Sequence, residues 1–479
     1  MYEQLEALIA GLSARVFQQV PLFGTEVEAI VLVLAAAMLF ATILLGVPQF
    51  RGVGIGLRLL SGKHDDPTAP GEVSQFQALS TALSGTVGLG NIAGVAIAIA
   101  LGGPGAAFWM FVIGFFAMAL KAGEVTLGVK YREIDADGTV HGGPMYTLKN
   151  GLAARGWTRS GRGLSLLYAV FAIGGCLPLV QINQSFSQAA GVIGFEPTRE
   201  AGLIYGIVFG ILIGLVTLGG VKSIARVTSK IVPLMCFIYL GSVLLILIAN
   251  AGAVPAAVAT IISSAFDPNS VAGGIIGSFV VGMRRAVFST EAGVGLPVIA
   301  HAAARTRHPA SEGMVALLEP MFDTMIVCMA TALMIVVTGV YDDGFTDVGM
   351  TSAAFASVIS WYPWFLLVAV FLFAYSTQLA IAYYFETVIG FLIGHGRKRN
   401  LAVRIVYCLL MPLGSVLVLG AVVDLIDSFF FLMVLPNVVG LILLAPILRR
   451  EVNDFLAGVK SGRIYSEGVT DETAMPRHD

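Results

Sequence analysis

Apolar segments long enough to cross a lipid bilayer recur along the whole chain, and they constrain its fold more than any other feature. A membrane-spanning helix needs about 20 mostly apolar residues. Here 57% of the residues are hydrophobic and only 12% are charged, against roughly 25% charged in soluble domains. We therefore expect an all-α polytopic membrane protein with about eleven transmembrane helices, at approximately 27–46, 75–101, 105–130, 166–192, 201–219, 226–250, 273–301, 312–339, 361–393, 402–423 and 428–448.

The basic residues predict how these spans are oriented. If the loop after the first span is cytoplasmic, most of the 28 Lys and Arg residues fall in cytoplasmic segments. Cytoplasmic loops of membrane proteins carry such an excess of positive charge. We therefore expect a multi-pass protein of the cell (inner) membrane, with its N-terminus outside and its C-terminus in the cytoplasm. The net charge of -2 gives no sign of a nucleic-acid partner.

Setting the first span aside leaves ten spans, which divide into two sets of five. Because five is an odd number, the two sets have opposite orientations in the bilayer, as in inverted-repeat transporters. We predict four regions. Residues 1–70 hold an N-terminal surface helix, an extra transmembrane helix and a cytoplasmic linker. The first five-helix repeat covers 71–250, the second covers 251–450, and a polar cytoplasmic tail covers 451–479.

Each repeat begins with a span that a polar, glycine-rich stretch interrupts, at 85–91 and at 288–295. An unsatisfied backbone group in hydrocarbon costs several kcal/mol, so such breaks persist only beside a cavity or inside protein. Paired breaks in corresponding halves indicate a substrate site, although close packing of helices at glycine is the alternative. The candidate ligand-contacting residues are Thr86, Gly88, Gly90 and Asn91 in the first break and Phe288, Ser289 and Thr290 in the second.

The ends of a broken helix suggest what the ligand is. Free N–H groups begin one half-helix and suit a carboxylate, while free carbonyl groups end the other and suit a cation. A zwitterionic amino acid with a sodium ion fits this pattern. Gln181 and Asn183 lie at membrane depth and contact either the ligand or a neighbouring helix. The hydroxyls of Ser376 and Thr377 either bind a cation or bond back to the preceding helical turn.

Four ionisable side chains lie within or near the spans, namely Glu124, Arg285, Glu291 and Asp323. Such residues are costly in hydrocarbon, and they are usually paired or functional. We expect them to gate the site or to hold the breaks, with structural pairing as the alternative. The four cysteines lack metal-ligand spacing, so the chain indicates no disulfide framework, no cofactor and no metal other than sodium.

Motifs over roughly residues 70 to 440 resemble those of the alanine or glycine:cation symporter family. They are Gln77-Ala78-Leu79, Gly88-Leu89-Gly90-Asn91-Ile92-Ala93-Gly94-Val95, Gly102-Gly103-Pro104-Gly105, Phe108-Trp109-Met110, Lys130-Tyr131-Arg132-Glu133, Gly142-Gly143-Pro144-Met145-Tyr146, Glu291-Ala292-Gly293, Ala300-His301-Ala302-Ala303-Ala304 and Asp323-Thr324. The resemblance implies a LeuT-type fold and sodium-coupled uptake of small neutral amino acids, without enzymatic chemistry.

The resemblance also implies roles for individual residues. Gln181 matches the family's substrate-contacting glutamine, and Thr377 joins the substrate-binding residues. Sodium would bind at Ser84, the carbonyl of Val87, Ser376 and Thr377. The chain departs from the family at Thr290, where asparagine is usual, and at Ile381, where tryptophan is common. A pocket bounded by Ile381 would be roomier, so we expect side chains somewhat larger than that of alanine to be accepted.

The expected mechanism is sodium symport by alternating access. The substrate carboxylate would bind half-helix N–H groups, and its ammonium would bind oxygen acceptors such as Gln181. The nearest alternative is a proton-coupled amino-acid transporter, with Glu124 or Glu291 titrating. An ion channel is an alternative of another class. The expected partners are a small neutral amino acid, Na+ and the lipid bilayer.

Overall fold

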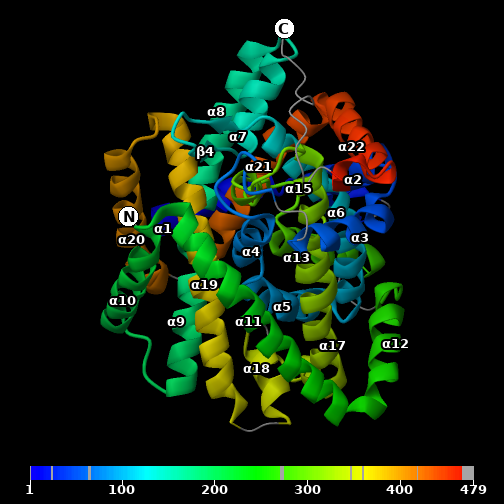
Figure 1. Ribbon diagram of the computed structural model, residues 1–479. Helices are drawn as coiled ribbons and strands as arrows, with labels where there is room; N and C mark the ends of the chain where they lie inside the picture. The colour runs from blue at the N-terminus through cyan, green and yellow to red at the C-terminus, as the bar shows by residue number, and fades with distance from the viewer. Residues whose placement is uncertain are drawn as a thin grey trace.

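The chain forms an almost entirely helical bundle (Figure 1). The computed structural model describes residues 2–22, 25–62, 66–269, 274–345, 348–358, 361–417 and 419–466. In Figure 1, helices α7, α8 and α22 and strand β4 gather at one end of the bundle, and α18 lies at the opposite end. Helices α4 and α5 lie in the interior, with α10 and α20 at one edge and α12 at the other.

The N-terminal region begins with a surface helix, as expected, but a short antiparallel hairpin follows it. Its elements are α1 (Tyr2–Val16), β1 (Gln19–Leu22), β2 (Thr25–Glu28), α2 (Ala29–Leu44) and α3 (Pro48–Leu60). The hairpin occupies the residues where the first span was expected to begin. Helix α3 turns 75° away from α2. Its Gly52 and Gly56 lie against Met314, Leu317 and Leu318 of the second repeat.

The first repeat contains a broken span followed by four further spans. Its elements are α4 (Gln75–Thr86), η1 (Leu89–Asn91), α5 (Ala93–Gly102), α6 (Gly105–Lys130), β3 (Glu133–Ile134), β4 (Val140–His141), α7 (Pro144–Tyr146), η2 (Thr147–Gly151), α8 (Thr158–Gly175), α9 (Val180–Ile193), α10 (Arg199–Thr217) and α11 (Gly220–Ala249). Ser74 starts α4, because its hydroxyl accepts from the Gln77 N–H while the Gln77 side chain accepts from the Ser74 N–H.

The second repeat also contains a broken span, α13 with α14, but the short helices η3 and α12 precede it. Its elements are η3 (Ala251–Ala253), α12 (Val254–Ala265), α13 (Gly274–Thr290), α14 (Val298–Ala302), α15 (Pro309–Ala316), α16 (Leu318–Pro320), η4 (Met321–Cys328), α17 (Met329–Thr338), η5 (Val340–Asp342), α18 (Val348–Ala356), α19 (Tyr362–Ile393), α20 (Arg397–Val416) and α21 (Leu419–Leu443). Segment η4 is a π-helical turn that places Asp323 in the core.

The predicted spans can be followed one by one in the structure. Eight described helices are long and apolar enough to cross a membrane, and the bent pair α2–α3 makes up to nine. The two broken spans, α4 with α5 and α13 with α14, fall outside this group because each half is short. An interruption at 176–179 also divides the fourth span into α8 and α9.

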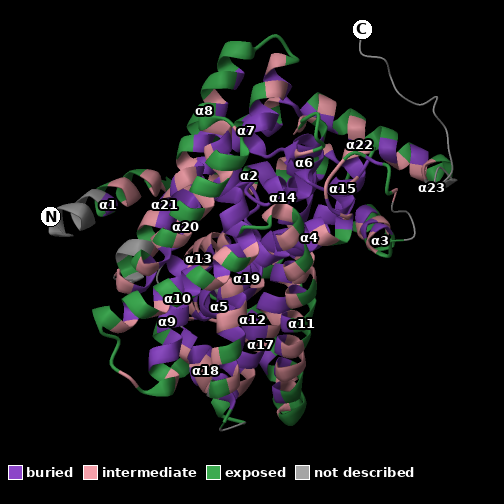
Figure 2. Cartoon of the chain, turned by 60° about the vertical axis from the view of Figure 1, so that its left-hand side comes forward, coloured by how far each residue is buried: buried purple, intermediate pink, exposed green. Residues whose placement is uncertain are grey.

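Burial separates the interior of the bundle from its lipid-facing surface (Figure 2). Helix α14 is fully buried and α4 and α5 are mostly buried, whereas about half of α13 is only partly buried. By contrast, α10, α11 and α20 expose large apolar side chains, for example Leu215, Phe237 and Leu409, each at least 70% exposed. An exposed apolar surface of this kind is suited to contact with lipid.

The tail differs from the expectation in its first part. Helix α22 (Ala445–Lys460) continues through residue 451 and buries Leu448, Val452 and Phe455 on one face. This amphipathic face packs against α6 and α15, so the helix lies on the protein rather than forming a free polar tail. The short helix α23 (Arg463–Ser466) follows, and residues 467–479 of the predicted tail lie outside the described residues.

Candidate functional site

The first break is held open by its own asparagine. Helix α4 ends at Thr86, Val87 is extended, and α5 begins at Ala93. The N–H of Gly88 donates to Asn91 Oδ1 at 2.9 Å. This bond satisfies a backbone group that the interrupted helix would otherwise leave unpaired. The Gly88 N–H is therefore used within the break, and the ligand must use other groups.

The second break separates α13 from α14 over residues 291–297. Gly293 and Gly295 have positive φ values of 88° and 84°, a region that glycine enters without steric cost. Glu291 also has a positive φ, of 50°, which is uncommon for a residue with a side chain. The hydroxyl of Thr290 accepts from the Ala292 N–H at 3.2 Å, so it stabilises the turn.

Asp323 joins the two breaks. Asn91 Nδ2 donates to Asp323 Oδ1 at 2.5 Å, and the hydroxyl of Ser289 donates to Asp323 Oδ2. Thr324 Oγ1 donates to the same carboxylate at 2.9 Å. All of these side chains are fully buried. This carboxylate, one of the four charges predicted to gate the site or to hold the breaks, is surrounded by neutral donors from both repeats.

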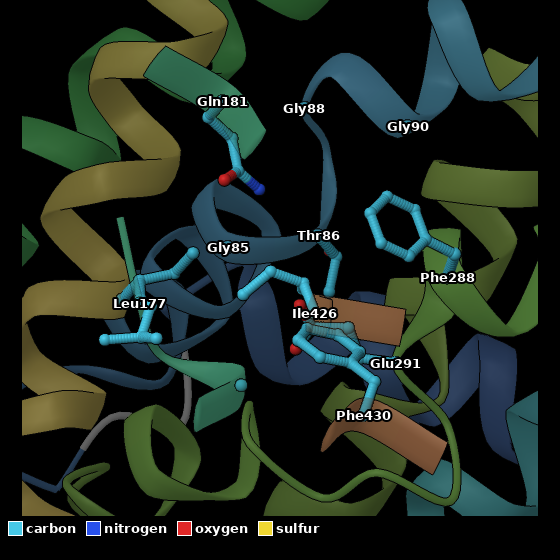
Figure 3. Close-up of a pocket in the computed structure, with 12 residues that line it drawn as sticks. Gly85, Thr86, Gly88, Gly90, Leu177, Gln181, Phe288, Glu291, Ile426 and Phe430 are labelled. Carbon is cyan, nitrogen blue, oxygen red and sulfur yellow. The ribbon is translucent and has the colours of Figure 1, made fainter. Parts of the chain in front are cut away.

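A small pocket lies between the breaks (Figure 3). It is lined by Gly85, Thr86, Gly88, Gly90, Gly175, Leu177, Gln181, Phe288, Glu291, Ile381, Ile426 and Phe430. Six predicted substrate residues are in this lining: Thr86, Gly88, Gly90, Gln181, Phe288 and Ile381. The other four, Asn91, Ser289, Thr290 and Thr377, are buried behind it. Sequence reasoning missed Leu177, Ile426 and Phe430, which are apolar residues without a motif.

A chain of hydrogen bonds behind the cavity orients the amide of Gln181. The Tyr407 hydroxyl donates to Gln378 Oε1, and Gln378 Nε2 donates to Gln181 Oε1 at 3.2 Å. Because amide oxygens accept and amide nitrogens donate, this chain leaves the NH2 group of Gln181 for the cavity. Figure 3 shows that nitrogen on the side facing Thr86. Gln181 was expected to accept from an ammonium, but its geometry makes it a donor.

Asn183, in the same span, contacts a neighbouring helix rather than the cavity. Its Nδ2 donates to the carbonyls of Gly414 and Leu417 at 3.0 and 2.7 Å. Of the two alternatives considered for Asn183, the interhelical hydrogen bond is the one observed.

The four predicted sodium ligands lie where α4 meets α19. The hydroxyl of Ser84 donates to the carbonyl of Ser376, and Val87 directly follows the end of α4. Ser376 Oγ donates to the Phe373 carbonyl at 3.1 Å, within its own helix. By contrast, Thr377 Oγ1 is buried without a hydrogen-bond partner among the described residues. Thr377 is thus the hydroxyl here without a hydrogen-bond partner among the described residues, while Ser84 and Ser376 donate their protons and keep oxygen lone pairs that a cation could use.

The remaining predicted charges have separate partners. Glu124 Oε1 accepts from the Gly293 N–H at 2.9 Å and from Asn437 Nδ2 at 2.6 Å, so it supports the second break. Arg285 pairs with Asp427 at 3.3 Å and lies 5.8 Å from the ring centroid of Phe288. Since Phe288 lines the cavity, this ion pair lies beside one of the lining residues. Glu291 is the ionisable residue that lines the cavity itself.

Hydrogen bonds also join the segments that flank the two broken spans, at the end of the bundle that carries β4. Glu72 N–H donates to the Ala303 carbonyl at 2.8 Å, and Arg132 Nη1 donates to the carbonyls of Ala302 and Ala304 at 2.6 Å each. Burial lowers the pKa of Arg132 to about 10, so it stays charged at neutral pH. This end of the bundle is therefore closed by a charged side chain bound to carbonyl groups.

Comparison with known proteins decides the family. A model of the sodium:alanine symporter family matches residues 13–467. The chain belongs to the sodium:alanine symporter family. It is 39% identical to the sodium/alanine symporter AgcS of Methanococcus maripaludis, over 87% of this chain and 92% of AgcS. It is also 33% identical to the "probable sodium/glutamine symporter GlnT" of Bacillus subtilis, over 82% of this chain and 80% of GlnT.

The fold agrees with this membership. The chain is similar to MhsT, solved in complex with L-phenylalanine, with a TM-score of 0.54 and 16% identity over 80% of this chain and 98% of MhsT. This similarity confirms the LeuT-type fold. The protein is a multi-pass membrane transporter rather than an enzyme, a sodium-coupled amino-acid symporter whose sodium is the coupling ion.

Proposed function

We propose that this symporter carries small neutral amino acids with sodium by alternating access around the cavity between its two breaks. The observation that carries the proposal is the lining of that cavity, which comes from both broken spans and from the fourth, ninth and eleventh spans. A site built from both repeats changes its exposure when the repeats move against each other.

The polar groups around the cavity suit a zwitterion. The substrate carboxylate binds the Gln181 amide and the N–H groups of the first break after Gly88. Sodium binds the Val87 carbonyl and the hydroxyl of Thr377, beside Ser84 and Ser376. The buried hydroxyl of Thr377 supports this placement, because a buried polar group without a partner is costly. One sodium carried inward gains about 2.3 kcal/mol per 100 mV of membrane potential.

The accepted side chains extend beyond alanine and glycine. Ile381 lines the cavity at the position where the family commonly has tryptophan, and an aliphatic side chain leaves more room. A relative in the same family carries a name that refers to glutamine. We therefore include serine and somewhat larger neutral amino acids in the proposed range.

The proposed setting is the cell (inner) membrane, with two five-helix repeats over 71–250 and 251–450 and the N-terminus outside. The end of the bundle with β4, Arg132 and α22 then faces the cytoplasm, and the Arg285–Asp427 pair covers the cavity from outside. The cytoplasmic contacts would open when substrate is released inward.

Uptake into proteoliposomes tests the proposal. Labelled alanine should accumulate with an inward sodium gradient and should stop when choline replaces sodium at fixed pH. Glycine, serine and somewhat larger neutral amino acids should then inhibit alanine uptake, and inhibition should weaken once the side chain is too large for the cavity. Uptake that persists in choline but follows a proton gradient would establish the proton-coupled alternative. Conductance that does not saturate with substrate would establish a channel.

A further inference from the structure

The cavity has donors on one side and a single carboxylate on the other. The NH2 group of Gln181 is directed into it from the fourth span, because Gln378 occupies the Gln181 oxygen. Among the described lining residues, Glu291 is the ionisable one. In Figure 3, Gln181 and Glu291 lie on opposite sides of Thr86. A ligand with a negative and a positive end therefore has a defined direction in this cavity.

The carboxylate of Glu291 makes no ion pair among the described residues. Glu291 is only 4% exposed, and its Oε2 has no hydrogen-bond partner in that part of the chain. The buried basic side chains of this region pair with other carboxylates: Arg285 with Asp427, and Lys121 with Glu319 at 3.2 Å. Lys121 attracts Glu291 electrostatically but is shared with Glu319, and a buried carboxylate without a direct partner is unfavourable, so a group on the ligand is the natural source of one.

The backbone presents this carboxylate to the cavity at a cost. Glu291 is the first residue after α13, and it has a φ of 50°. A residue with a Cβ enters this region at an energetic cost, and such conformations concentrate at ligand-binding positions. The neighbouring glycines Gly293 and Gly295 complete the turn without this cost. The strain falls on the one residue of the turn whose side chain lines the cavity.

We propose that Glu291 binds the ammonium group of the substrate and is the residue that selects amino acids over carboxylates without an amine. The inference rests on the proposed function and adds the direction of the bound substrate. The substrate carboxylate points to Gln181 and the first break, and the substrate ammonium points to the second break. The ammonium supplies three N–H donors and the missing positive charge. The two ends of the substrate thus contact different repeats.

Sodium is not the expected partner of Glu291. The sodium ligands proposed above belong to α4 and α19, whereas Glu291 belongs to the turn between α13 and α14. The two assignments give different results when the charge of Glu291 is removed. Loss of an ammonium contact changes the preference for amines, while loss of a sodium contact changes the sodium requirement.

Equilibrium binding of labelled alanine to the purified full-length protein tests the proposal, with lactate and propionate as competitors that lack the amine. Glu291→Gln keeps the shape and removes the charge. It should raise the half-saturating alanine concentration about tenfold to a hundredfold, the usual effect of losing a charged hydrogen bond. The preference for alanine over lactate should fall by a similar factor, while the half-saturating sodium concentration stays unchanged.

Glu124→Gln is the matched control. Glu124 is also a buried carboxylate at the second break, but it bonds to Gly293 and lies outside the cavity lining. It should leave the preference for alanine over lactate unchanged, even where the amount of folded protein falls. If Glu291→Gln keeps that preference, or changes only the sodium requirement, the proposal is wrong.

A second variant covers the case in which Glu291→Gln does not fold. Glu291→Asp keeps the charge but withdraws it by one methylene, so alanine should bind more weakly while lactate is still rejected. Wild-type alanine affinity in Glu291→Asp would overturn the proposal, as would loss of the discrimination against lactate. If the wild-type protein shows no sodium-dependent alanine binding, the proposed function fails instead, which is a separate result.

Discussion

Replacing Gly88 with alanine tests whether the close approach of the first break to α19 forms the sodium site. A Cβ on Gly88 would lie 2.8 Å from Thr377 Oγ1, where ordinary contact begins at 3.4 Å. Threonine is β-branched and stiff at χ1, and Thr377 is 1% exposed in the middle of α19. The hydroxyl therefore cannot swing away, and the chain of the break must move instead.

The size of the effect follows from this overlap. An added methyl group in a well-packed core costs about 1–3 kcal/mol. If that cost falls on the arrangement that binds sodium, the half-saturating sodium concentration rises roughly 5- to 150-fold. Thr377→Ala should also weaken sodium binding, because it removes the free oxygen. The double variant Gly88→Ala with Thr377→Ala should recover the packing and thermal stability of Thr377→Ala, but not the sodium affinity.

The assay is sodium-dependent alanine uptake over a series of sodium concentrations, together with thermal unfolding of the purified protein in sodium and in choline. Gly94→Ala is the control, since a Cβ on Gly94 meets nothing within 4 Å, although Gly94 lies in the same broken span. If Gly88→Ala needs no more sodium than Gly94→Ala does, the contact between Gly88 and Thr377 has no part in sodium binding, and the reasoning is refuted.

Three further predictions follow from other contacts. Asp323→Asn should abolish sodium-dependent uptake and lower the unfolding temperature, because the new amide cannot accept from both Asn91 and Ser289; uptake at the wild-type rate would contradict this. Arg285→Gln should speed exchange of bound alanine with external alanine several-fold, measured by isotope chase, because the pair with Asp427 no longer covers the cavity. Burial and the neighbouring His141 lower the pKa of His395 to about 4, from an ordinary 6.5. The folded protein therefore loses stability as pH falls between these values. His395→Asn lacks this titrating group, so its unfolding temperature should fall less than that of the wild type between pH 7.5 and 5.

The spans and both breaks were predictable because they depend on local composition. Residues 85–91 and 288–295 interrupt apolar segments, and hydrophobic burial decides the rest of each span. The two small hairpins were not predictable on this basis, since their strands are only two to four residues long. Residues 451–460 carry charges and were predicted to be tail, yet they continue α22, which buries Val452 and Phe455 against the protein.

The chemistry of individual side chains was less predictable, because it depends on contacts between residues far apart in the chain. Gln181 lines the cavity, but which end of its amide faces the cavity is set by Gln378, which lies 197 residues later. Asp323 was recognised as a costly buried charge, but its partners Asn91 and Ser289 come from both repeats. The orientation of an amide or the partners of a carboxylate follow only from the assembled fold.

The contacts around the cavity also indicate where sodium can act. Asp323 ties the two breaks together, and separating them would leave a buried carboxylate without its donors, which is strongly unfavourable. The two breaks should therefore stay paired while the other helices of the repeats move. The contact between α4 and α19 is different, because Thr377 Oγ1 has no hydrogen-bond partner there among the described residues. A sodium ion bound at the proposed site would add coordination at that contact, so its binding would strengthen this interface while the pairing of the breaks is maintained.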